Sequence, residues 1–221
     1  MDLALLIRKG LHRLHNDGPK AAFRSAISYL KPSQTEDEFD AIHGTDTCGL
    51  EPLWNFRISS PNRRFGAAYQ STDSDELSSA VNFLGVPVST FTFIDVGAGK
   101  GRTLIIASEL GFKRIVGVEF VPELADIARK NLAKLGIGNA KVESADAADF
   151  QFPQSDLVVY FYNPFSWEVM QKVVANLRNH TKRLYVIYKV PKCAALFDSF
   201  MRGLGCPPGA PRIQVWEATN N

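Results

Sequence analysis

The sequence predicts an α/β protein with a doubly wound, mostly parallel sheet. Short apolar runs of strand length alternate with longer segments whose apolar residues recur at helical spacing. One of the runs, residues 157–162 (LVVYFY), is apolar throughout, as expected for a strand that helices cover on both faces. A strand, a glycine-rich turn and a helix also follow one another directly over residues 91–110, which is where such folds commonly hold a ligand.

Each expected element is bounded by residues that favour its start or its end. The helix that begins near Asp73 has an acidic cap and ends before Gly85 and Pro87, and Pro122 stands in the first turn of another helix. The expected strands are 91–96, 114–119, 141–144, 157–162, 184–190 and 213–218, and the expected helices are 73–84, 103–110, 122–135, 167–179 and 194–204.

The chain is expected to form one domain with an N-terminal arm. Residues 1–68 are predicted to be that helical and irregular arm, and residues 69–221 the ligand-binding domain. Within the arm, residues 35–40 are acidic and polar, which favours a surface linker, and residues 43–49 (HGTDTCG) gather turn formers into a loop. The stretch 55–69 holds three arginines and is expected to be irregular and exposed.

The composition favours a soluble globular protein of the cytoplasm. A hydrophobic share of 45% and a charged share of 22% are ordinary values, and a net charge of +2 gives no strong nucleic-acid signal. The three cysteines show no CxxC spacing and the four histidines are scattered, so neither a disulfide framework nor a metal site is expected. No apolar run is long enough to span a bilayer.

The spacing of the glycines narrows the kind of ligand. Asp95 ends the strand, and Gly97, Gly99 and Gly101 follow it. A dinucleotide fingerprint needs a small residue where this chain has Arg102, and a phosphate-binding P-loop needs a lysine followed by serine or threonine. Both of those cofactor classes are therefore disfavoured.

An acid, three alternating glycines and a second acid at the end of the next strand resemble the class I, seven-stranded methyltransferases that use S-adenosylmethionine. The resemblance implies a Rossmann-like methyltransferase domain in residues 69–221. That cofactor carries an ammonium and a sulfonium, which favour nearby carboxylates. The resemblance implies that Glu119 binds the ribose hydroxyls and Asp146 the adenine amine, and that Phe120 stacks on the ring. It assigns cofactor binding to Tyr69, Thr72, Asp95, Gly97, Ala98, Gly99, Gly101, Glu119, Phe120, Asp146, Ala147 and Asn163.

The turn Asn163-Pro164-Phe165 resembles the Asn/Asp-Pro-Pro-aromatic motif of amine and amide N-methyltransferases, shortened by one proline. In that motif the Asn carbonyl accepts a hydrogen bond from the target nitrogen, and the aromatic ring packs against the target. The nearer resemblance is to the non-SET histone-lysine methyltransferases and bacterial members similar to them, which carry a tyrosine-led polar segment like residues 69–72 (YQST). On that likeness Asp46 and Thr47 also help to close over the methionine end of the cofactor.

The expected function is that of an S-adenosylmethionine-dependent methyltransferase. The enzyme is expected to methylate the nitrogen of an amine, in a protein side chain or a small molecule, with Asn163, Pro164 and Phe165 at the reacting centre. The alternative is a protein that binds the cofactor, recruits a partner and transfers no methyl group. The absence of a lysine-rich tail disfavours histone as the acceptor.

Two further expectations concern packing. Residues 160–162 are expected to belong to the sheet core, and Trp54, Trp167 and Trp216 to be packing residues. Trp167 is also close enough to the turn at 163–165 to border the acceptor site. The resembling family ends with an antiparallel pair of strands, whereas only residues 213–218 are expected to be extended here. The sheet is therefore expected to be one strand short at that edge.

Overall fold

The computed structural model describes residues 37–51 and 69–218. Residues 1–36 of the predicted arm, most of the arginine-rich stretch and Trp54 lie outside these ranges, so the division into arm and domain stays a prediction. In the part of the chain that is described, no helix is long and apolar enough to cross a membrane.

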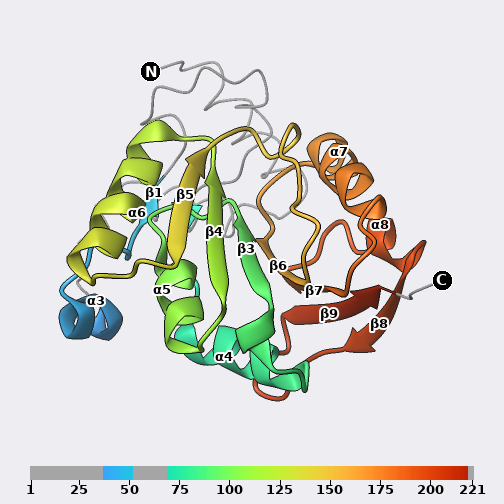
Figure 1. Ribbon diagram of the computed structural model, residues 1–221, viewed down its shortest axis with the longest axis horizontal. Coiled ribbons are helices and arrows are strands. Elements are labelled where there is room, and N and C mark those ends of the chain that lie inside the picture. The colour runs from blue at the N-terminus through green and yellow to red at the C-terminus, as the bar shows by residue number, and fades with distance from the viewer. Residues whose placement is uncertain (1–36, 52–68, 219–221) are drawn as a thin grey trace, which may run out of the picture.

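The main sheet has seven strands in the order β5-β4-β3-β6-β7-β9-β8 (Figure 1). The pairs from β5 to β7 are parallel, and β9 runs antiparallel to both β7 and β8. The predicted doubly wound, mostly parallel sheet is thereby confirmed. The strands are β3 (Thr92–Val96), β4 (Arg114–Glu119), β5 (Ala140–Ser144), β6 (Leu157–Tyr162), β7 (Leu184–Lys189), β8 (Met201–Gly205) and β9 (Ile213–Ala218).

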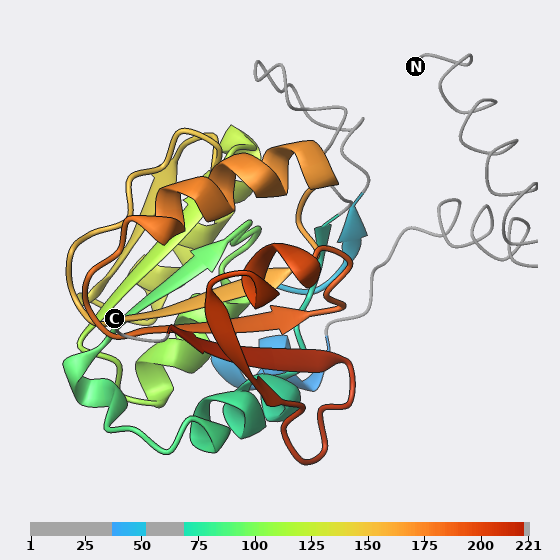
Figure 2. The ribbon, with the colours of Figure 1, turned by 90° about the vertical axis from the view of Figure 1, so that its right-hand side faces the viewer.

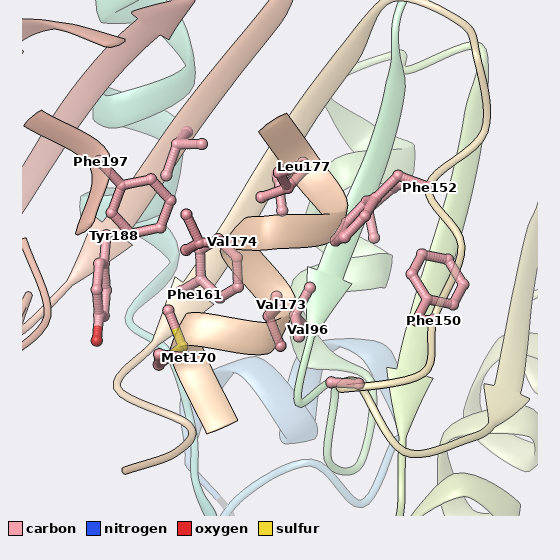
Figure 3. Close-up of a cluster of buried hydrophobic side chains, with 14 of the residues drawn as sticks. Val96, Phe150, Phe152, Phe161, Met170, Val173, Val174, Leu177, Tyr188 and Phe197 are labelled. Atoms are coloured by element: carbon pink, nitrogen blue, oxygen red, sulfur yellow. The ribbon is translucent and has the colours of Figure 1, made fainter. Parts of the chain in front are cut away.

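Helices cover both faces of this sheet, and each face has its own apolar cluster (Figure 2). On one face, Phe161 and Tyr188 of the sheet pack with Met170 and Val174 of α7 and with Phe197 of α8 (Figure 3). The other face packs against α4, α5 and the C-terminal part of α6. The helices are α4 (Ser74–Phe83), α5 (Arg102–Glu109), α6 (Pro122–Lys134), α7 (Trp167–Arg178) and α8 (Ala195–Asp198).

The expected helix at 194–204 is wrong. Only α8 is helical, and Met201–Gly205 forms the edge strand β8, which pairs with β9. Gly203 and Gly205 are poor helix formers, and the strand register shifts between them. The sheet therefore has both strands of the antiparallel pair and is not one strand short at this edge.

The linker expected at 35–40 is also wrong where the structure describes it. Glu38–His43 forms the short helix α3, because the side chain of Asp37 caps it by accepting a hydrogen bond from the Asp40 backbone N–H at 3.1 Å. Asp40 is 3% exposed rather than on the surface. After α3, the strand β1 (Leu50–Glu51) pairs antiparallel with β2 (Tyr69–Gln70).

Candidate functional site

The carboxyl ends of β3, β4 and β6 lie side by side, because β3 pairs in parallel with the other two strands. This edge of a parallel sheet is the usual ligand site of the fold class. The glycine turn begins here, where the backbone N–H groups of Gly97 and Ala98 both donate to the Val118 carbonyl. The turn is thus fixed to β4 before α5 begins.

Asp95 stands at the end of β3 and is 3% exposed. Burial raises the pKa of its carboxyl to about 7, the hydrogen bond from the Thr103 hydroxyl opposes this shift, and the nearby Glu119 adds to it. A cationic ligand beside Asp95 would favour its charged form.

Glu119 ends β4, is 4% exposed and binds the glycine turn directly. Its Oε2 accepts a hydrogen bond from the Gly99 backbone N–H at 2.8 Å, and its Oε1 accepts one from the Val121 N–H at 2.9 Å. Burial raises the pKa of Glu119 to about 7, although these backbone bonds oppose the shift. Each oxygen keeps a lone pair for a further donor, such as a hydroxyl group.

Two hollows open at this edge of the sheet. The Asp95 hollow is lined by Asp95, Thr103 and Tyr160 among others, and the Glu119 hollow by Glu119, Phe120 and Leu124 among others. The Glu119 hollow is partly open to solvent. Four residues line both hollows and therefore lie between the two acids: Tyr69, Gln70, Gly97 and Tyr162.

The glycines of the turn are needed for packing inside the protein. Gly99 has a φ of +53°, and a Cβ there would run into the ring of Tyr69. A Cβ on Gly97, at φ +95°, would lie 3.1 Å from the Cβ of Pro164. At both positions the atoms nearest to the missing Cβ are those of protein side chains.

Tyr69 and Thr72 lie where the resemblance placed them, beside the glycine turn. Both line the Asp95 hollow, and the Tyr69 hydroxyl donates to the Thr47 carbonyl. The Thr72 hydroxyl is 4% exposed and lies 3.1 Å from the Tyr160 hydroxyl. Segment 69–72 is thus held against the sheet from two directions.

The turn after β6 has strained backbone. Asn163 has a φ of +40°, and its Oδ1 is buried without a hydrogen-bond partner in residues 37–51 and 69–218. Asn163 stands between Tyr162 and Pro164, which both line the Glu119 hollow, without lining it itself. The ring of Phe165 lines the same hollow and meets the ring of Phe120 edge-on, with 6.3 Å between centroids.

Asp146 and Ala147 follow β5 and line neither hollow. Asp146 accepts a hydrogen bond from the Ala148 N–H at 3.0 Å, and Ala147 is 2% exposed in the core cluster that packs against α7. Their assignment to the adenine end of the cofactor stays a prediction.

A buried cluster around Arg102 was missed by the sequence analysis. Arg102 is 6% exposed, pairs with Asp37 at 2.6 Å and donates from Nε to the Thr47 hydroxyl at 2.8 Å. Asp40, 3.6 Å from Arg102, loses solvation on burial, but hydrogen bonds from Thr45, Thr47 and Cys48 outweigh that and lower its pKa. Arg102 therefore holds segment 37–48 to the start of α5.

Asp46, in the same segment 37–48, is bound to the glycine turn and to α6. Its side chain pairs with Lys100 at 2.9 Å, and its carbonyl accepts from Asn131 Nδ2 at 2.9 Å. Thr47 is fully buried. Neither Asp46 nor Thr47 lines the two hollows, so their predicted contact with the cofactor stays a prediction.

The expected packing roles of residues 160–162 and of the tryptophans are confirmed only in part. Tyr160 and Phe161 are buried in the sheet core as expected, whereas Tyr162 also lines both hollows. Trp216 is fully buried, but Trp167 is 43% exposed at the start of α7 and is not a core packing residue. Its place at the border of the acceptor site stays a prediction. The position of Tyr162 at the last residue of its strand was the available signal for a site role.

A parallel sheet with an antiparallel edge pair, and a glycine turn between two strand-end acids, are features of the class I methyltransferase fold. Residues 93–183 match the family described as a methyltransferase domain. The ribosomal protein L11 methyltransferase of Clostridium perfringens is 30% identical over 95 residues, which cover 42% of this chain and 30% of that protein. The release factor glutamine methyltransferase of Vibrio cholerae is 41% identical over 49 residues, or 22% and 17% of the two chains. The chain therefore spans less than a third of the length of these curated relatives.

Solved structures agree on the fold. A putative RNA methyltransferase from Pyrococcus horikoshii superposes with a TM-score of 0.52 at 16% identity, covering 82% of this chain and 96% of that one. A SAM-dependent methyltransferase from Aquifex aeolicus gives a TM-score of 0.50 at 14% identity, covering 68% and 100%. The described residues thus share the fold of these methyltransferases, as the sequence predicted.

Proposed function

We propose that the protein is an S-adenosylmethionine-dependent methyltransferase that methylates an amine nitrogen. The observation that carries the proposal is the pair of buried acids, Asp95 and Glu119, on either side of the glycine turn. Both have a pKa raised to about 7 by burial, and each borders its own hollow. Perturbed carboxyls in a hollow are typical of functional sites.

The residues of this edge fit that cofactor. Glu119 has lone pairs free for the two hydroxyls of a ribose, because its backbone bonds use one on each oxygen. Asp95, at the other hollow, would pair with the ammonium of the methionine part. Phe120 lines the Glu119 hollow, where a ring can stack.

Asn163 and Phe165 support transfer to nitrogen. When bound, the cofactor supplies a methyl group on a positively charged sulfur. The unpartnered Asn163 Oδ1 is buried next to the Glu119 hollow, and the side chain would turn toward the hollow to accept a hydrogen bond from the N–H of the acceptor. That bond would aim the nitrogen lone pair at the methyl group. Phe165 and Tyr162, which line the Glu119 hollow, would exclude water from the reacting atoms.

The acceptor is proposed to be an amine of a protein side chain or of a small molecule. The names of the two curated relatives, a ribosomal protein L11 methyltransferase and a release factor glutamine methyltransferase, support a protein acceptor. Cys193 and Cys206 are not joined in a disulfide, which supports a reducing compartment such as the cytoplasm.

Methyl transfer is tested by incubating the full chain with a cell lysate and cofactor that carries a labelled methyl group. We expect label in one or few acceptors, identified by mass spectrometry, and no label with an Asp95→Asn variant. Lys192→Met, on an exposed lysine far from both acids in sequence, is the matched control and should label normally. Tight cofactor binding without any labelled acceptor would instead favour the partner-recruiting alternative.

A further inference from the structure

A buried ion pair lies next to Tyr162, one of the residues that line both hollows. Lys189, the last residue of the otherwise uncharged strand β7, is 2% exposed, and its ammonium pairs with the carboxylate of Glu76 in the first turn of α4. The Glu76 side chain is 15% exposed. The same ammonium lies 4.5 Å from the ring centroid of Tyr162. The pair therefore joins α4 and β7 to a residue that lines both hollows.

Burying such a pair costs solvation free energy, so stability alone is a weak reason for its presence. Its place in the sheet suggests another reason. Tyr162 and Lys189 are opposite each other in the parallel register of β6 and β7, which puts both side chains on the same face. An ammonium over a ring face fixes the orientation of that ring by electrostatic attraction.

The two hollows indicate where Tyr162 would lie relative to the bound cofactor, and this step rests on the proposed function. The ammonium end of the cofactor would lie at Asp95 and its ribose at Glu119, and the sulfonium joins these two parts. The residues that line both hollows, Tyr162 among them, therefore flank the place of the sulfonium. A cationic side chain behind this ring would repel the sulfonium unless a carboxylate balanced it.

We propose that Lys189 and Glu76 form a charge-balanced positioning pair that holds the Tyr162 ring beside the sulfonium. Lys189 orients the ring, and Glu76 cancels the lysine charge that the cofactor would otherwise meet. Arg212 also approaches Glu76, at 3.5 Å, but its side chain is 59% exposed and its charge is screened by solvent. The pair thus orients the ring without adding a net positive charge beside the positively charged donor.

The test compares dissociation constants for S-adenosylmethionine, which carries the sulfonium, and S-adenosylhomocysteine, which carries a neutral thioether. Calorimetry on the full chain gives the ratio of the two constants for each variant. Glu76→Gln leaves the lysine charge unbalanced and should weaken the sulfonium ligand, relative to the thioether, by roughly three- to tenfold. Lys189→Met should shift the ratio in the opposite direction, and the double variant should return it to near the native value.

A purely structural pair would change both dissociation constants by the same factor, because unfolding or loosening does not distinguish the two ligands. Equal factors in both single variants would therefore overturn this inference and leave the proposed function standing. If the native protein bound neither ligand, the proposed function and the inference would fall together. Lys192→Met, an exposed lysine three residues further on, removes the same charge and should leave the ratio unchanged. If one single variant does not fold, the other single variant still tests the inference, because each of them should shift the ratio.

Discussion

The carboxylate of Glu119 accepts a hydrogen bond from the backbone N–H of Gly99 at 2.8 Å. This bond joins the end of β4 to the glycine turn that follows β3. It means that a single side chain both shapes the turn and presents its remaining lone pairs to the Glu119 hollow. Loss of this carboxylate should therefore affect binding more than its burial alone would suggest.

Replacing Glu119 by Gln should weaken S-adenosylhomocysteine binding by about 1–3 kcal/mol, the scale of a lost hydrogen bond to a charged group. Calorimetric titration measures the loss. Glu123→Gln, on an exposed residue of the next helix, is the matched control. Unchanged affinity in Glu119→Gln would remove this residue from the proposed ribose site.

Replacing Asn163 by Ala should leave cofactor binding intact and lower the rate of methyl transfer about ten- to hundredfold, because an acceptor-positioning hydrogen bond is lost. Transfer is followed with labelled cofactor and the acceptor found in the lysate. Full activity in this variant would contradict the role of the unpartnered Oδ1.

Gly99→Ala should destabilise the protein by about 1–3 kcal/mol, because the new methyl group overlaps the Tyr69 ring and the residue has a positive φ. Denaturant unfolding measures the change. Gly138→Ala is the control, since a Cβ there meets no atom within 4 Å. In a Tyr69→Ala background the cost of Gly99→Ala should shrink, and full additivity would show that the two residues do not meet.

The pH dependence follows from the raised pKa of Asp95 and Glu119, both about 7 in the folded protein against 3.8 and 4.5 as ordinary values. Between those limits the folded state binds more protons than the unfolded state, so the stability of the ligand-free protein should fall as pH rises from about 4 to about 7. Thermal unfolding across this range checks the slope. Asp95→Asn should flatten it, and a slope unchanged by this variant would contradict the assignment.

The fold was largely predictable because apolar periodicity and turn residues act locally. Segments 91–96 and 157–162 are apolar runs of strand length, which predicts strands that helices cover, and the structure has the buried strands β3 and β6 at these positions. The edge strand β8 was missed because its sequence, MRGLG, contains two glycines and shows no alternation of apolar and polar residues. It becomes a strand only through pairing with β9.

The site was predictable where its charged residues lie at the ends of strands, as Asp95 and Glu119 do. It was not predictable where contacts join distant segments. Nothing local shows that Arg102 pairs with Asp37, or that Lys189 meets Glu76 across 113 residues of chain, because these contacts exist only once the sheet has formed. In the sequence, Arg102 only showed that the dinucleotide fingerprint is not present. In the structure it binds Asp37 and Thr47 and so holds segment 37–48 to the start of α5.

The central claim is that the hollows between Asp95 and Glu119 bind S-adenosylmethionine. Calorimetric titration of the full chain with S-adenosylmethionine, repeated with Asp95→Asn, tests this claim most directly. We predict saturable binding to the native protein at one site, with affinity that rises as pH increases through about 7 and is markedly weaker in the variant. Absence of binding at millimolar cofactor, or equal affinity in the variant at every pH, would contradict it.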